Sequence, residues 1–174
     1  GAFNLVMGRG REVGAVLLED PRVAAVSFTG SEATGRKVAQ ACIGREGPMA
    51  KFQLEMGGKN PLVVLDDAEM DVAVECAVNG AFHSTGQRGT ASSRIVVTAG
   101  IHDRFIDAMQ RRMAALVVGD ARQPGTVIGP VVDESQLAQD LRYIELGQRE
   151  GGQLVCGGQA LERVGGKRGF YLTP

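Results

Sequence analysis

The chain has 174 residues, of which 44% are hydrophobic and 22% are charged, and its formal net charge is −1. This composition is typical of a globular protein with a hydrophobic core, and it lacks the basic surplus of proteins that bind nucleic acid or anionic membranes. No apolar run approaches the roughly 20 residues that a membrane-spanning helix requires, so neither nucleic acid nor membrane is an expected partner.

Short apolar runs alternate with stretches of helical periodicity along the sequence, which is typical of α/β proteins. In chain order we expect strands at residues 5–7, 23–28, 49–54, 62–65, 94–98 and 154–156. The expected helices span residues 11–18, 32–43, 66–84, 101–116 and 136–150.

The second of these helices has a clear start. Ser31 is its expected N-cap, and Glu32 places a negative charge in its first turn. We expect it to bury Val38, Ala41 and Cys42. A breaker follows at residues 44–48, and it suggests two domains, residues 1–50 and 51–174.

The three cysteines, Cys42, Cys76 and Cys156, are far apart and odd in number. This pattern argues against a disulfide framework and fits the reducing cytoplasm, and we expect each cysteine to be a buried small hydrophobic residue. The two histidines, His83 and His102, have no partner at metal-ligand spacing, so no metal site is expected.

Both ends of the sequence resemble interior segments. Residues 1–7 lack the charged leader of a signal peptide, and Met7 lies within an apolar run. Residues 170–174 carry no capping tail. We therefore expect the chain to be a piece of a longer protein.

Two glycine-bearing turns are typical of sites that bind the phosphate of a nucleotide. Gly8, Gly10 and Gly14 approach a dinucleotide-binding fingerprint, although the last interval is one residue too long. Glycines that simply turn the chain are the alternative. Residues 28–31 (Phe-Thr-Gly-Ser) join a strand to a helix, whose unpaired N–H groups can bind phosphate. An ordinary N-cap is the alternative at this second turn.

A third motif, residues 53–61, has Glu55 at the end of an apolar strand and before a Gly-Gly turn. A carboxylate in that position is poorly placed for solvation and can serve as a general base. An ordinary surface glutamate is the alternative. A fourth motif, residues 82–94, ends a helix and leads into a strand.

These four motifs, in this order, resemble the aldehyde dehydrogenase superfamily. Its members carry a Phe-Thr-Gly-Ser turn, then a glutamate followed by leucine or methionine and two glycines, then a Gly-Gln-x-Cys segment with an arginine shortly after. The resemblance covers essentially all 174 residues and about the middle third of a full-length member. Residues 54–67 and 71–94 are most similar to the 2,5-dioxovalerate (α-ketoglutaric semialdehyde) dehydrogenases.

The resemblance implies part of a Rossmann-like cofactor domain followed by part of an α/β catalytic domain, with NAD or NADP as cofactor. Glycines 8, 10 and 14 would line the adenosine end, and the stretch from Gly30 to Gly35 would open the helix that packs on the dinucleotide. The Met56 carbonyl would help to hold the nicotinamide. The implied cofactor-binding residues are Gly8, Gly10, Gly14, Thr29, Gly30, Ser31, Glu32, Ala33, Thr34, Gly35, Met56 and Gly57.

The resemblance also assigns the catalytic positions. In the family, a cysteine thiolate attacks the aldehyde, hydride passes to the nicotinamide, and water activated by a glutamate hydrolyses the thioester. Glu55 matches the glutamate, but Gly89 stands where the cysteine belongs. We therefore expect this chain not to oxidise aldehydes. A deliberate substitution that traps substrate, natural loss of the nucleophile and an error in the sequence remain open explanations.

The implied parent enzyme would act on a small aldehyde, with a dicarboxylic semialdehyde favoured, and would assemble as a homodimer or homotetramer. Residues that read the adenine ribose lie outside the chain, so the choice between NAD and NADP cannot be read from it. One alternative is a non-catalytic relative that binds nucleotide or has a structural role. Another passes its acyl group to coenzyme A or phosphate, and Glu55 argues against it because hydrolysis needs a water-activating base.

Overall fold

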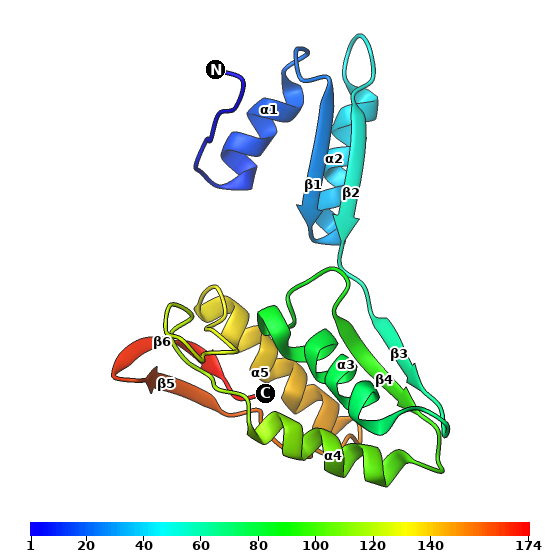
Figure 1. Ribbon diagram of the computed structural model, residues 1–174. Helices are drawn as coiled ribbons and strands as arrows, with labels where there is room; N and C mark the ends of the chain where they lie inside the picture. The colour runs from blue at the N-terminus through cyan, green and yellow to red at the C-terminus, as the bar shows by residue number, and fades with distance from the viewer. The chain divides into compact units, whose positions relative to one another are not determined.

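The computed structural model describes residues 1–174, which divide into two compact units, residues 1–58 and 59–174 (Figure 1). Each unit contains a pair of parallel strands joined by a helix, so the α/β class expected from the sequence is confirmed. None of the helices combines the length and the apolar character needed to cross a membrane.

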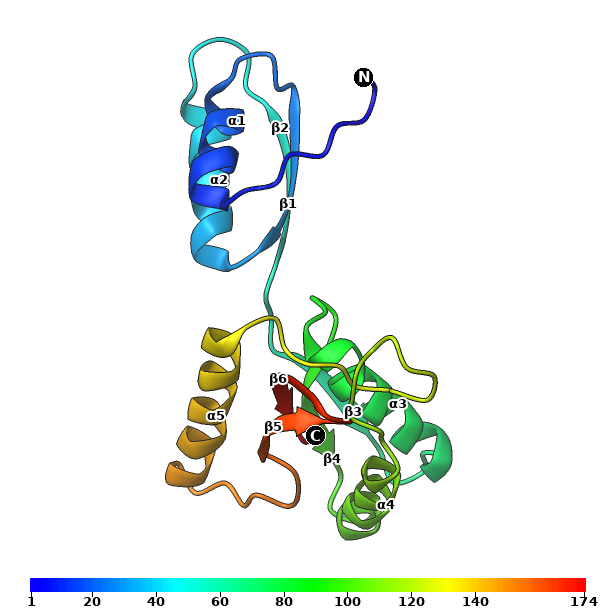
Figure 2. The same ribbon diagram turned by 90° about the vertical axis from the view of Figure 1, so that its left-hand side faces the viewer.

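The first unit is a β-α-β unit preceded by a short helix. In order, its elements are a π-helical turn (Gly10–Gly14), α1 (Ala15–Glu19), β1 (Ala25–Gly30), α2 (Glu32–Gly44) and β2 (Lys51–Met56). Helix α2 is the crossover that parallel strands require, and Figure 2 shows α1 and α2 on the same face of the strand pair.

Helix α2 forms where the sequence predicts it. The backbone of Ser31 is extended, and its hydroxyl accepts a hydrogen bond from the Thr34 N–H at 3.3 Å, as an N-cap does. Val38 and Cys42 lie one turn apart on the face that packs with Ala50 into the small core of this unit. The expected burial of Val38 and Cys42 is confirmed, whereas Ala41, at the margin of that face, is half-buried.

The second unit begins with another β-α-β unit and ends in a hairpin. In order, its elements are β3 (Asn60–Val64), α3 (Met70–Phe82), a 3-10 turn (His83–Gly86), β4 (Ser92–Val97), α4 (His102–Ala114), α5 (Glu134–Arg149), β5 (Ala160–Val164) and β6 (Lys167–Leu172). Strands β3 and β4 pair in parallel through α3, and β5 and β6 are antiparallel.

The core of the second unit lies between the β3–β4 pair and helices α3 and α4. Phe105 of α4 is only 1% exposed, and it packs with Val64 of β3 and Val78 of α3. At the edge of this layer, Arg112 of α4 binds Glu75 of α3 at 2.7 Å. The hydrogen bond from this guanidinium lowers the pKa of the Glu75 carboxyl, so the carboxylate form is favoured and the two helices are held together.

Several expected elements differ from the structure. The strands expected at residues 5–7 and 154–156 are irregular segments, and the apolar side chains of residues 5–7 are 63–81% exposed. An apolar run becomes a strand only where a partner strand pairs with it, and neither segment has one. Helix α3 starts at Met70 because residues 66–69 form a turn. The β5–β6 hairpin was not expected.

The boundary between the two compact units falls after Gly58, and the expected division into a cofactor domain and a catalytic domain between residues 50 and 51 stays a prediction. The boundary lies after Gly58 because β2 pairs with β1, which keeps residues 51–56 in the first unit.

Candidate active site

The carboxyl ends of β1 and β2 lie side by side because the two strands are parallel and in register. Thr29 pairs with Glu55, and Gly30 pairs with Met56. Helix α2 begins two residues after β1 ends, so its N-terminus lies at the same edge. The structure therefore brings together the second and third motifs, which are separated by more than twenty residues in the sequence.

The first turn of α2 presents unpaired backbone N–H groups, as every helix N-terminus does. Ser31 caps the turn and also donates its hydroxyl to Thr34 Oγ1 at 3.0 Å. Glu32 bonds with Arg36 one turn later at 2.7 Å, which leaves its carboxylate at the side of the helix. Ala33 is exposed. The end of the helix is thus an open, polar surface of the kind that binds anionic groups.

Two glycines allow the close packing behind this surface. A Cβ on Gly30 would lie 2.5 Å from the Phe28 ring, and a Cβ on Gly35 would lie 2.6 Å from the Met56 sulfur. A larger residue at either position would force the Phe28 ring or the Met56 side chain to move. Gly57, in contrast, is exposed, and nothing surrounds the place of its missing Cβ.

A groove of about 500 Å³ lies beside the helix N-terminus. Gly10 and Gly14 line it, together with Thr34 of α2, whereas Gly8 does not. Gly8 instead lies against Val13, where a Cβ would collide with the valine side chain. The rest of the lining is mostly apolar and comes from Leu17, Leu18, Val23, Ala25, Val26, Ser27, Phe28 and Val38.

Glu55 projects into solvent from the end of β2 and is oriented by a neighbour. Gln53 donates its amide to Glu55 Oε1 at 3.1 Å. The two residues are two positions apart on a strand, so their side chains share one face. Sequence reasoning missed Gln53, although its i, i+2 spacing from Glu55 is a readable signal.

Gly89 lies in the second unit, after a turn with unusual backbone geometry. Ser84, Thr85 and Gly86 all have positive φ angles, of 56°, 54° and 68°. For a serine and a β-branched threonine this left-handed conformation is strained, and such strain clusters at functional sites. The fourth motif thus approaches position 89 through a tight left-handed turn that no periodicity in the sequence indicated.

Gly89 lies in the turn that precedes β4. Its carbonyl accepts a hydrogen bond from Asn60 Nδ2 at 2.8 Å. Arg94, the arginine of the fourth motif, donates to the Lys59 carbonyl at 2.6 and 3.0 Å. The end of the third motif and the second half of the fourth motif are therefore hydrogen-bonded to each other within this unit.

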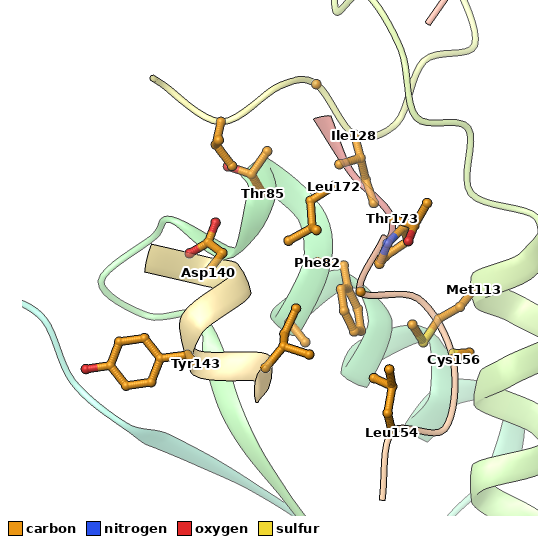
Figure 3. Close-up of a pocket in the computed structure, with 16 residues that line it drawn as sticks. Phe82, Thr85, Met113, Ile128, Asp140, Tyr143, Leu154, Cys156, Leu172 and Thr173 are labelled. Atoms are coloured by element: carbon orange, nitrogen blue, oxygen red, sulfur yellow. The ribbon is translucent and has the colours of Figure 1, made fainter. Parts of the chain in front are cut away.

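A separate pocket of about 390 Å³ in the second unit is mainly apolar (Figure 3). Phe82, Leu154 and Leu172 line it, with Cys156 on its wall. It contains none of the predicted site residues.

Cys42 is buried as expected, but the expectation is wrong for Cys76 and Cys156, which are exposed. No group of three or more histidine, cysteine or acidic side chains is arranged to hold a metal ion.

Comparison with known proteins identifies the family of this chain. The aldehyde dehydrogenase family model matches residues 1–174. The chain is 44% identical over its whole length to an α-ketoglutaric semialdehyde dehydrogenase of Bacillus subtilis, of which it covers 35%. It is 45% identical over 92% of its length to a betaine aldehyde dehydrogenase of Cereibacter sphaeroides, of which it covers 32%.

A betaine aldehyde dehydrogenase of Staphylococcus aureus, solved in complex with NAD⁺, has a similar structure. The TM-score is 0.87 at 32% identity, over 97% of this chain and 33% of the solved one. The chain thus spans about a third of the length of the relatives that it matches. The match over every residue and the shared fold together show that the chain belongs to the aldehyde dehydrogenase family.

Proposed function

We propose that the protein containing this chain has the architecture of an NAD(P)-dependent dehydrogenase that oxidises an aldehyde to a carboxylic acid. The observation that carries this proposal is the junction of β1, α2 and β2. There the unpaired N–H groups of a helix N-terminus and the Glu55 carboxylate lie at one edge of a parallel strand pair. Ligands of α/β proteins bind at such carboxyl edges.

The residues of the first unit fit a dinucleotide. Gly30 and Gly35 place no side chain at the start of α2, so a pyrophosphate can approach the N–H groups beside Ser31. The groove lined by Gly10 and Gly14 can take the adenosine end. When bound, the cofactor accepts a hydride. Thr29 and the Met56 carbonyl are proposed to lie on its nicotinamide side.

Glu55 is proposed to be the general base. Its exposed carboxylate can take a proton from a nucleophile or from a water molecule, and the hydrogen bond from Gln53 holds one of its oxygens in place. This base supports hydrolysis of an acyl intermediate over its transfer to coenzyme A. Product analysis with and without coenzyme A distinguishes the two outcomes.

Position 89 is proposed to be the site of the nucleophile, and a glycine there cannot supply one. Without a thiolate, no bond forms to the aldehyde carbon, so nothing aligns its hydrogen for transfer. We therefore propose that the protein with Gly89 binds cofactor and aldehyde but does not turn over.

The proposed substrate is a small dicarboxylic semialdehyde. This rests on the similarity to an α-ketoglutaric semialdehyde dehydrogenase over the whole chain. The comparable identity to a betaine aldehyde dehydrogenase makes a cationic aldehyde the second candidate. A cytoplasmic location, from the sparse and odd cysteines, and a homodimeric or homotetrameric assembly, from the family resemblance, are proposed on the sequence alone.

Restoring the cysteine tests the proposal. The full-length protein with Gly89→Cys should produce NAD(P)H from a semialdehyde, while the Gly89 protein should produce none above background. The expected gain is at least about 1,000-fold, since removing a nucleophile in comparable enzymes costs that much or more. Absorbance at the nicotinamide band measures it, with 2,5-dioxovalerate and betaine aldehyde compared as substrates.

The second candidate function is a non-catalytic relative that binds nucleotide, and Gly89 is the observation that favours it. The same experiment separates the two functions. If the Gly89→Cys protein binds NAD(P)⁺ but reduces none of it with any small aldehyde, the binding function stands and the dehydrogenase proposal fails.

A further inference from the structure

The loop that carries position 89 is hydrogen-bonded to strand β3 by the side chain of Asn60. Asn60, the first residue of β3, directs its amide at this loop from 29 residues earlier in the sequence. Its Nδ2 atom lies 2.8 Å from the Gly89 carbonyl and 3.0 Å from the Ala91 carbonyl. An amide nitrogen carries two hydrogens, so both contacts can be satisfied at once.

Further hydrogen bonds brace Asn60 itself. Arg94 donates to the carbonyl of Lys59 through two of its nitrogens, which fixes the peptide that precedes Asn60. The pairing of β3 with β4 also shifts register here, from Asn60 opposite Ser92 to Pro61 opposite Arg94. Irregular pairings of this kind re-aim side chains and occur next to active sites.

Apart from Asn60, one other side chain ties the loop to the unit: Arg88 donates its Nη2 atom to the Asn79 carbonyl of α3 at 2.9 Å. This second bond holds the residue before position 89 and leaves the Gly89 and Ala91 carbonyls to Asn60. On one side the loop follows the left-handed turn at residues 84–86, and within it the Ala91 N–H bonds only as far back as the Arg88 carbonyl. The Asn60 amide thus ties residues 89 and 91 to a strand, which is a rigid element. The direction in which a side chain at position 89 leaves the backbone depends on this tie.

We propose that Asn60 is a positioning residue, which holds the backbone of position 89 so that a nucleophile there points at the substrate. The proposal rests on the proposed function in taking position 89 as the site of the nucleophile. Asn60 has no part in bond making and acts through the backbone alone. Its loss should therefore lower kcat and leave the binding of aldehyde and cofactor nearly unchanged.

The test uses the full-length Gly89→Cys protein as the parent. Asn60→Ala removes the donor, and Asn60→Asp replaces it with a carboxylate that faces two carbonyl oxygens. Asn60→Ser keeps a shorter hydrogen-bond donor and serves as the conservative variant. If Asn60→Asp does not fold, the comparison of Asn60→Ala with Asn60→Ser carries the test. Asn4→Ala, at an exposed asparagine in the first unit, is the matched control.

Asn60→Ala and Asn60→Asp should lower kcat by about 10- to 100-fold, the effect of misplacing a reacting group by about 1 Å. KM for both substrates should stay within about twofold, which marks an interaction used after binding. Asn60→Ser should keep more of the kcat than Asn60→Ala, and Asn4→Ala should keep all of it. Two results for Asn60→Ala overturn the proposal: a kcat within about twofold of that of the parent, or a rise in KM as large as the fall in kcat.

A separate measurement decides the inference if the Gly89→Cys protein proves inactive and the proposed function fails. Amide hydrogen exchange at residues 89–91 is then compared between the Gly89 protein and its Asn60→Ala variant. Exchange that is about 10-fold faster or more in the variant supports the anchoring of the loop by Asn60. Unchanged exchange overturns it, whatever the protein catalyses.

Discussion

At the scale of single residues, Glu55 and Gly89 have opposite consequences for chemistry. Glu55 offers an exposed carboxylate with one oxygen held by Gln53, which suits proton transfer. Gly89 offers only backbone, and its carbonyl is already engaged by Asn60. In the proposed function, Glu55 thus supplies the base, and position 89 lacks the side chain that would be the nucleophile.

Glu55→Gln in the Gly89→Cys protein should lower steady-state turnover by about 100-fold or more, because the amide cannot accept the proton that a general base removes. If Glu55 acts chiefly on the deacylating water, a burst of NAD(P)H equal to the enzyme concentration should precede the slow phase. Stopped-flow absorbance measures both phases. Glu46→Gln, at an exposed glutamate of the α2–β2 loop, is the control, and equal turnover in the two variants would remove Glu55 from the mechanism.

At the scale of elements, α2 combines a structural role with a proposed binding role. Its cap residue, Ser31, satisfies the Thr34 N–H, and its first turn is the proposed pyrophosphate site. Gly35 lets the same turn approach β2 closely enough to pack on Met56. A change at the cap should therefore be seen in both stability and binding.

Ser31→Ala should destabilise the first unit by about 1 kcal/mol, the usual cost of removing a serine cap. It should also weaken NAD(P)⁺ binding, because the helix N-terminus loses its ordered first turn and a hydroxyl. Urea unfolding and cofactor titration check the two effects. Ser31→Thr keeps the capping oxygen and should restore most of the stability. Full stability of Ser31→Ala would show that the cap seen in the structure contributes nothing.

At the scale of the whole molecule, long-range contacts hold segments together that are distant in sequence. Asp120, in the segment after α4, binds Arg122 at 2.8 Å and Lys167 of β6 at 3.0 Å. The hydrogen bonds from Arg122 and then Lys167 place the pKa of the Asp120 carboxyl well below its ordinary value of 3.8. The carboxylate thus ties the segment after α4 to the C-terminal hairpin.

A carboxyl group whose pKa is lower in the folded state stabilises the fold above its unfolded pKa and loses that effect as the pH falls through the folded pKa. Asp120→Asn should therefore lower the melting temperature of the protein at pH 7. The difference from the unsubstituted protein should shrink progressively below about pH 3.8. Asp107→Asn, at an exposed position of α4, is the control for the charge change. A difference that stays constant from pH 7 to pH 2 would contradict this role of Asp120.

Local features of this protein are readable from sequence because their causes are local. Ser31 before an amphipathic stretch predicts the start of α2, and alternating apolar runs predict β1, β3 and β4 to within a few residues. The apolar segments at residues 5–7 and 154–156 misled the same reasoning, since a strand exists only where another strand pairs with it. The β5–β6 hairpin was not predicted, because charged residues interrupt the alternation of apolar and polar residues in its strands.

The sequence by itself determined the family, through four ordered motifs, and it placed a glycine at position 89, because the identity of a residue needs no fold to be read. Only the tertiary structure decided which groups meet. It set Thr29 beside Glu55 and hydrogen-bonded Asn60 to Gly89, and it bent residues 84–86 into a left-handed turn. These contacts depend on strand register and chain crossing over 26 to 29 residues, which no local pattern of residues encodes.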